Sequence, residues 1–121
     1  MLRKASTLVA IVDDDSAVLD SLCFLLEVAG HDVVVYTSAL SFLQDRSTRP
    51  ACLILDHHMP QMSGLDLVAR LRKEGNALRV ALITGAASPA IVSRAFQLGV
   101  NKVLEKPVPE DELLRFVEVK N

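Results

Sequence analysis

Short apolar runs that alternate with longer amphipathic stretches restrict the fold of this chain more than any other feature. Five runs rich in Val, Ile and Leu predict strands: TLVAIV from Thr7, DVVVY from Asp32, CLIL from Cys52, RVALIT from Arg79 and KVLE from Lys102. Most of them lack strict alternation of apolar and polar residues, as expected for parallel strands that are covered by helices on both faces. The regular alternation of strand and helix signals predicts βαβ units around a parallel sheet.

The segments between these runs carry apolar residues at helical spacing and recognisable helix ends. We predict helices from about Ser16 to Ala29, from Ser38, after Gly64, from about Pro89 and from Pro109. Serine is a favoured N-cap, and the acidic residues 110–112 suit the positive N-terminus of the last helix. With right-handed crossovers, these units predict a five-stranded βα sandwich.

Length and composition exclude several classes of protein. The 121 residues fit one domain, which we place at 1–121 with its core at about 7–117. A net charge of -2 argues against direct nucleic-acid binding, and the apolar runs are far shorter than the roughly 18 residues of a membrane span. Cys23 and Cys52 lack the spacing of a metal or redox pair, so we expect small buried side chains in a reducing cytoplasm.

Polar side chains recur where the predicted strands end. Asp13 and Asp14 follow the first strand, Asp56 follows CLIL, Thr84 ends the fourth strand and Lys106 follows the fifth. Functional sites of open parallel sheets lie at this carboxyl edge. If the first and third strands are neighbours, the three carboxylates converge in one crevice.

Three converging carboxylates need a positive partner. Two of them ~4 Å apart repel by about 4 kcal/mol at an effective dielectric near 20. Mg²⁺ relieves this repulsion, since it prefers carboxylates, carbonyls and water. With the Thr84 hydroxyl and the Lys106 ammonium beside it, such a pocket suits phosphoryl transfer to Asp56. Each residue alone has an ordinary structural explanation, as Asp15 does as a helix cap, so the interpretation depends on the joint pattern.

Taken in order, these motifs resemble the receiver domains of bacterial two-component response regulators. The matching segments are IVDDD at 11–15, LILDHHMPQMSGLDL at 53–67, ITGAA at 83–87 and LEKPV at 104–108. The pattern D-x-x-M-P-x-M-x-G after the third strand makes the combination specific. The resemblance covers about residues 7–117. It implies a doubly wound, flavodoxin-like α/β fold with strand order 2-1-3-4-5.

The resemblance also implies a role for each acidic residue. Asp56 is then the phosphoacceptor, and Asp13 and Asp14 are the acidic pair that binds Mg²⁺ together with Asp56. The main-chain carbonyl of His58 is the remaining protein ligand, so the adjacent histidines are not a zinc motif. The His58 side chain is expected to overlook the phosphoryl site, and His57 to be a packing residue.

Further roles follow for the other matching positions. Thr84 is the switch hydroxyl that follows the phosphoryl group, and Lys106 pairs with that group. A cis bond is implied between Lys106 and Pro107. Gly64 is expected to permit a tight turn after the phosphoacceptor.

The implied function is a phosphorylation switch rather than a conventional enzyme. The phosphoryl donor is a sensor histidine kinase or a phosphotransfer protein, and the domain catalyses its own phosphorylation and dephosphorylation. The added charge shifts the surface around the fourth helix, the fifth strand and the fifth helix. A downstream effector with transcriptional output and a homodimer formed on phosphorylation are both compatible with this function.

Some residues depart from the family pattern or stay open. Val103 occupies the position where many receivers have an aromatic switch partner, which puts the coupling to Thr84 in doubt. Phe116 is either an exposed contact for a partner or a packed residue, and His31 is expected to be a solvated turn residue. Three other functions remain as alternatives: a degenerate, phosphorylation-independent interaction module, an aspartate-nucleophile phosphohydrolase, and a flavodoxin-like cofactor binder. The hydrolase usually has a second acid where His58 stands, and the cofactor binder needs a Gly-rich loop after the first strand.

Overall fold

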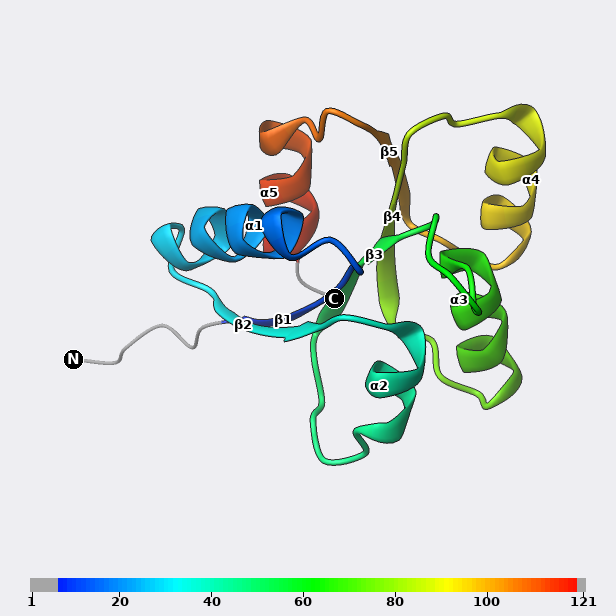
Figure 1. The fold of residues 1–121 in the computed structure, drawn as a ribbon, viewed down its shortest axis with the longest axis horizontal. Coiled ribbons are helices and arrows are strands. Elements are labelled where there is room, and N and C mark those ends of the chain that lie inside the picture. The colour runs from blue at the N-terminus through cyan, green and yellow to red at the C-terminus, as the bar shows by residue number, and fades with distance from the viewer. Residues whose placement is uncertain (1–6, 120–121) are drawn as a thin grey trace.

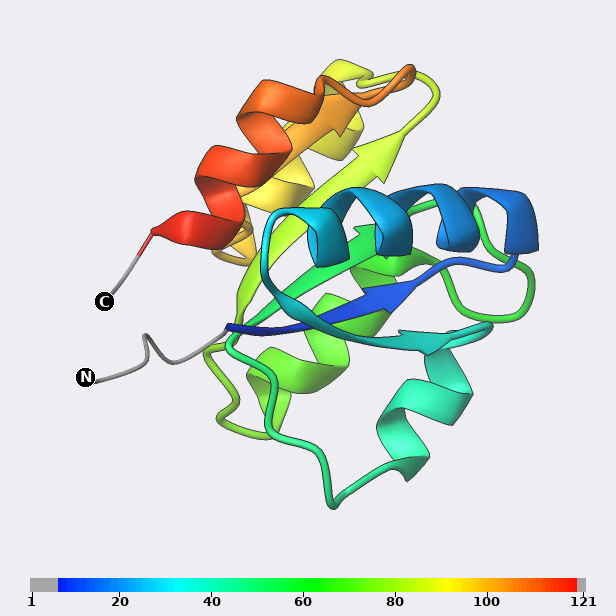
Figure 2. The ribbon, with the colours of Figure 1, turned by 90° about the vertical axis from the view of Figure 1, so that its left-hand side faces the viewer.

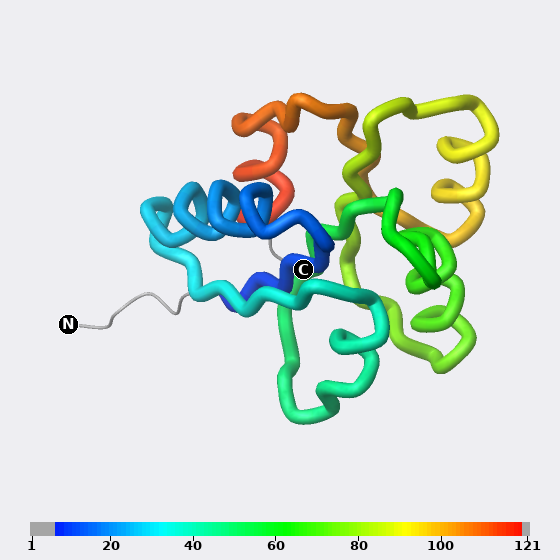
Figure 3. Tube along the Cα trace, in the orientation of Figure 1, coloured from blue at the N-terminus to red at the C-terminus, as the bar shows by residue number. Residues whose placement is uncertain are grey.

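All five predicted strands form, and they pair in parallel in the order β2-β1-β3-β4-β5. The computed structural model describes residues 7–119. Its elements are β1 (Leu8–Val12), α1 (Ser16–Val28), β2 (Asp32–Tyr36), α2 (Ala39–Gln44), β3 (Cys52–Asp56), α3 (Gly64–Lys73), β4 (Arg79–Thr84), α4 (Pro89–Gln97), β5 (Lys102–Glu105) and α5 (Glu110–Glu118). Figures 1 and 3 show how the chain passes from each strand through a helix to the next parallel strand. The predicted doubly wound α/β fold is confirmed.

Helices cover both faces of the sheet and divide the core into two layers. Helices α1 and α5 lie together on one face, and α2, α3 and α4 lie on the other (Figures 1 and 2). Successive residues of β1 alternate between the layers: Val9 and Ile11 face α1 and α5, whereas Ala10 and Val12 face the opposite layer. Because both faces are buried, the central strands are apolar along their middle residues, which explains their lack of alternation.

Local hydrogen bonds fix the helix starts close to the predicted positions. Asp15 caps α1, accepting from the backbone N–H groups of Ala17 and Val18. Ser38 and Ser88 cap α2 and α4, and Ser63 forms a capping box at the start of α3. Among residues 7–119, no helix has the length and hydrophobicity that a membrane span requires.

Several side chains lie elsewhere than the spacing indicated. Phe116 is buried, with the Arg79 guanidinium 4.4 Å from its ring centre, so it is a packed residue and not an exposed contact. His31 is half-buried, and neither of its ring nitrogens, both buried, has a hydrogen-bond partner among the described residues, so its prediction as a solvated residue is wrong. The exposed aromatic residues are instead Phe24 and Phe96, at 71% and 83% exposure.

The two cysteines are free, as predicted, but only one of them is fully buried. Cys52 lies in β3 within the core. Cys23 lies on α1 and is half-buried, because the buried stripe of that helix is formed by Leu19, Leu22 and Leu26. The predicted burial of both cysteines is therefore correct for Cys52 alone.

The amino edge of the sheet, where the strands begin, is closed by the guanidinium of Arg72. This group donates hydrogen bonds of 2.8–3.1 Å to the carbonyls of Asn76, Leu78, Leu98 and Gly99. It thereby joins the end of α3 to the end of α4. Asn101 continues this edge, accepting at Oδ1 from the N–H of Val80.

Candidate functional site

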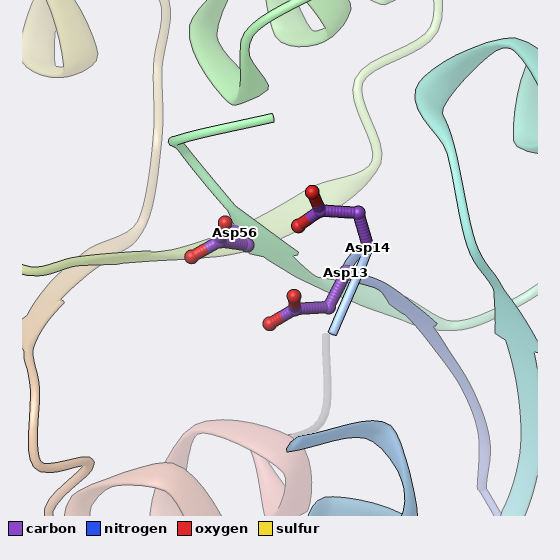
Figure 4. Close-up of side chains that lie close together, drawn as sticks. All are labelled: Asp13, Asp14 and Asp56. Atoms are coloured by element: carbon purple, nitrogen blue, oxygen red, sulfur yellow. The ribbon is translucent and has the colours of Figure 1, made fainter. Parts of the chain in front are cut away.

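Three carboxylates meet at the carboxyl edge of the sheet. β1 and β3 are neighbours, with Val12 opposite Leu55, so Asp13 and Asp56 lie side by side directly beyond them. Figure 4 shows the side chains of Asp13, Asp14 and Asp56 at the ends of these two strands. One oxygen of each carboxylate lies within 4.8 Å of the others. The predicted convergence of the three acids is therefore found in the structure.

Asp13 is an almost fully buried carboxylate. It is 2% exposed, and its Oδ1 accepts a hydrogen bond of 2.9 Å from the N–H of Asp15. Its Oδ2 is buried and has no hydrogen-bond partner among residues 7–119. Burial raises the pKa of Asp13 to about 6, with a further contribution from the negative charge of Asp56 and in spite of the Asp15 hydrogen bond.

Lys106 supplies the positive charge of the site. Its Nζ lies 3.0 Å from Oδ1 of Asp56, which is 3% exposed. Burial alone would lower the pKa of Lys106, but the hydrogen bond and charge of Asp56 raise it overall. The backbone N–H of Lys106 donates to the carbonyl of Thr84, and the bond to Pro107 is cis, as the family resemblance implied.

The donor set fits a small hard cation. Asp13, Asp14 and Asp56 offer only oxygen atoms, the ligands that Mg²⁺ prefers. The buried Oδ2 of Asp13 has a free lone pair that no N–H or O–H group of the described chain uses. Buried, partly desolvated carboxylates at this separation are stabilised by a divalent ion.

Thr84 ends β4, the strand next to β3, so it lies at the same carboxyl edge of the sheet as Asp56. It continues the alternation of Val80 and Leu82, which face α3 and α4, and it is 0% exposed. Its Oγ1 lies 3.0 Å from Nε2 of His58. The sequence placed the His58 imidazole near the site, but it gave no signal for this contact.

Gly64 is required for a reason other than the one we expected. Its φ is not in the positive range, so no special turn conformation is needed. A Cβ at this position would instead lie 2.6 Å from the carbonyl oxygen of Asp56 and 2.9 Å from Cα of His57. The Gly64 N–H donates to the carbonyl of His57 over 2.9 Å. The start of α3 is thus packed directly against the backbone of the acidic pocket.

Comparison with known proteins identifies the family. The response regulator receiver domain family matches residues 9–118. The chain belongs to this family. Response regulator protein TodT of Pseudomonas putida is 36% identical over 114 residues, covering 93% of this chain and 50% of TodT. Transcriptional regulatory protein FixJ of Azorhizobium caulinodans is 37% identical, covering 90% of this chain and 52% of FixJ.

A solved structure agrees with these relatives. Full-length FixJ from B. japonicum matches with a TM-score of 0.86 and 30% identity, over 95% of this chain and 57% of FixJ. The chain spans about half the length of the curated relatives it matches.

Within this receiver domain, Val103 takes the place that we associate with an aromatic switch partner. It lies in β5 opposite Leu82 and packs, half-buried, against the core layer that faces α3 and α4. The contact to the Thr84 hydroxyl comes from His58, on the loop after β3. His57 is also half-buried, with Nδ1 3.4 Å from the N–H of Leu65, and burial lowers its pKa.

Proposed function

We propose that the chain is one receiver domain that acts as a phosphoacceptor switch in the cytoplasm. Asp56 receives a phosphoryl group from the phosphohistidine of a sensor histidine kinase or a phosphotransfer protein. The observation that carries this proposal is a nearly fully buried Asp56, paired at 3.0 Å with Lys106 and grouped with two further carboxylates. No purely structural role requires this concentration of charge at one strand end.

The transfer is a displacement at phosphorus. A carboxylate oxygen of Asp56 attacks the phosphorus atom and forms the new P–O bond. The P–N bond of the donor breaks, and its electron pair returns to the imidazole nitrogen of the donor. The donor leaves as a neutral imidazole because its other ring nitrogen carries a proton. The Lys106 ammonium lies against Asp56 and offsets the negative charge on the transferred oxygens.

Asp13, Asp14, Asp56 and the main-chain carbonyl of His58 are the groups that would hold Mg²⁺. When bound, the ion supplies positive charge next to the carboxylates and to the transferred phosphoryl oxygens. The unpartnered Oδ2 of Asp13 supports this assignment. The same residues would support self-catalysed hydrolysis of the aspartyl phosphate.

The phosphoryl group then shifts the surface formed by α4, β5 and α5. The Thr84 hydroxyl leaves its present partners and donates a hydrogen bond to a phosphoryl oxygen. This movement of Thr84 repositions the loop that leads into α4. The largely exposed Phe96 on α4 lies on this surface. We infer that the output passes to an effector domain or protein, by way of a homodimer or directly. The name of FixJ, a transcriptional regulatory protein, supports a transcriptional output.

Phosphorylation by phosphoramidate, followed by intact mass, tests the function. We expect a gain of one phosphoryl group that requires Mg²⁺ and is absent in Asp56→Asn. A folded chain that forms no adduct under any condition would contradict the switch and favour a phosphorylation-independent interaction module. Rapid turnover of many phosphate esters without a lasting adduct would favour a phosphohydrolase.

A further inference from the structure

The hydroxyl of Thr84 is fully hydrogen-bonded in the resting chain. A hydroxyl donates one hydrogen bond and accepts two. Oγ1 donates to the carbonyl of Ala86 over 3.1 Å and accepts from the N–H of Ala86 over 3.3 Å. The remaining acceptor position faces Nε2 of His58 at 3.0 Å. All partners are satisfied when the His58 imidazole carries its proton on Nε2 and donates it to Oγ1.

The orientation of the His58 ring is supported by its neighbours. The rings of His57 and His58 pack edge to face, with their centres 4.9 Å apart. The His57 ring is held in turn by the N–H of Leu65, and its backbone N–H donates to the carbonyl of Ile83 over 2.9 Å. The segment that begins at Asp56 is therefore fixed against β4, with His58 directed at Thr84.

This bond joins the two elements whose relative movement would signal phosphorylation. His58 lies two residues after the proposed phosphoacceptor, and Thr84 ends the strand that leads to α4. To donate a hydrogen bond to a phosphoryl group on Asp56, the Thr84 hydroxyl has to break its hydrogen bonds with His58 and Ala86. Because Thr84 is 0% exposed, water does not replace the lost partners freely.

We propose that His58 is a positioning residue for Thr84. The imidazole N–H of His58 holds the Thr84 hydroxyl in its resting arrangement and opposes the formation of a hydrogen bond from this hydroxyl to the phosphoryl group. His58 thereby gives the Thr84 hydroxyl a side-chain partner in addition to the backbone of Ala86, whereas the Val103 side chain has no polar group to offer. This inference rests on the proposed function of Asp56 and Thr84. It concerns a side-chain contact and is separate from the main-chain carbonyl of His58.

The first test measures the affinity for beryllofluoride, an analogue of the phosphoryl group, in the presence of Mg²⁺. Losing one hydrogen bond to a buried hydroxyl in the resting state makes His58→Ala bind the analogue about fivefold more tightly than wild type. His58→Gln, which places an amide N–H near the position of Nε2, restores an affinity close to that of wild type. Equal affinities of wild type and His58→Ala would overturn the proposal.

The second test places the same change in a background without the hydroxyl. In Thr84→Val, His58→Ala should leave the affinity unchanged, because the group on which His58 acts is gone. The same increase in both backgrounds would show that His58 acts on the phosphoryl site directly, and that result also overturns the proposal.

A third measurement needs neither metal nor analogue. In ¹⁵N spectra of histidine-labelled protein, we expect Nε2 of His58 to carry the proton in wild type. The ¹⁵N chemical shift of Nε2 should change in Thr84→Val. A wild-type His58 with its proton on Nδ1 and a bare Nε2 contradicts the donor geometry. These results are separable from the proposed function: a wild type that does not bind beryllofluoride, or an Asp56→Asn variant that binds it equally well, contradicts the switch itself.

Discussion

The two edges of the sheet treat their polar groups in opposite ways. At the amino edge, Arg72 donates to four carbonyls, Arg79 donates to the carbonyl of Phe116 over 3.0 Å, and Asn101 accepts from β4. At the carboxyl edge, buried acids face one another, and an oxygen of Asp13 has no hydrogen-bond donor among the described residues. The amino ends of β4 and β5 therefore lie in a satisfied network, whereas the carboxyl ends of β1 and β3 lead into an unsatisfied one.

This difference separates stability from function. A buried polar group that has all its partners stabilises the fold, whereas one without partners weakens it until a ligand binds. Substitutions at the amino edge should therefore lower the free energy of unfolding the most. The carboxyl edge should become more stable when its charges are removed, at the expense of binding Mg²⁺.

The largest effect is expected at the amino edge. Arg72→Ala leaves four carbonyls without their donor, and we expect it to lower the free energy of unfolding by about 3–4 kcal/mol in urea titrations. Arg70→Ala is the matched control. Arg70 is half-exposed, and its one ion pair within residues 7–119 is with Glu74, so its loss should be about 0.5 kcal/mol. Equal losses in the two variants would remove the contrast between the edges.

The next effect is a pH dependence at the carboxyl edge. The pKa of Asp13 is about 6 in the folded chain, above its usual 3.8, so folding favours its protonated form. This stabilisation is complete below pH ~4 and is lost as the pH rises through about 6, for a total of about 3 kcal/mol in metal-free protein. Asp13→Asn should lack the decline. Mg²⁺ should restore stability at pH 7 in wild type only, which unfolding experiments at several pH values can check.

A smaller loss is expected where the carboxyl edge is tightly packed. A Cβ at position 64 would press on the Asp56 carbonyl, so Gly64→Ala should cost about 2 kcal/mol and slow phosphorylation by phosphoramidate. Gly85→Ala, where nothing lies within 4 Å of the added atom, serves as the stability control and should change little. A Gly64→Ala variant as stable as Gly85→Ala would show that this end of α3 can move away.

The smallest effect concerns the ion pair between α3 and α4. Arg94 Nη2 lies 2.9 Å from Oδ1 of Asp66, and both side chains are about half-exposed. Because water and salt screen such pairs, Arg94→Ala should lower the free energy of unfolding by no more than about 0.5 kcal/mol. A decrease in the free energy of unfolding as large as that of Arg72→Ala would mean that the Arg94–Asp66 ion pair holds α4 as firmly as the Arg72 hydrogen bonds do.

Much of this molecule follows from local sequence signals. The apolar runs and the caps at Asp15 and Ser38 are local signals, and together with helical spacing they located the strands and helices. The convergence of the acids followed from one further assumption, that β1 and β3 are neighbours. These are the features that periodicity and strand ends determine directly.

The features that the sequence did not predict depend on contacts between distant segments. His58 and Thr84 are 26 residues apart, and their contact depends on the path of a loop and on one side-chain rotamer. Arg72 reaches the carbonyls of Leu98 and Gly99 from the end of α3, although these residues are 26 and 27 positions further along the chain. Phe116, which the sequence left open between an exposed and a packed position, is buried on α5 with Leu113 and Val117, and the Arg79 guanidinium lies over its ring.

The bonds from Arg72 also determine how α4 is able to move. They hold the carbonyls of Leu98 and Gly99, just beyond its last residue. Among the described residues, no hydrogen bond or ion pair joins residues 89–92 to α3, and Ile91 packs only through apolar contacts against the core. A helix of 9 residues is about 13 Å long. A rotation of about 10° around the fixed end would displace Pro89 by about 2 Å, while the carboxyl end of α4, which leads to β5, would hardly move. Helix α4 is thus held by hydrogen bonds at its carboxyl end, and the end that is able to move is the amino end, which follows Thr84.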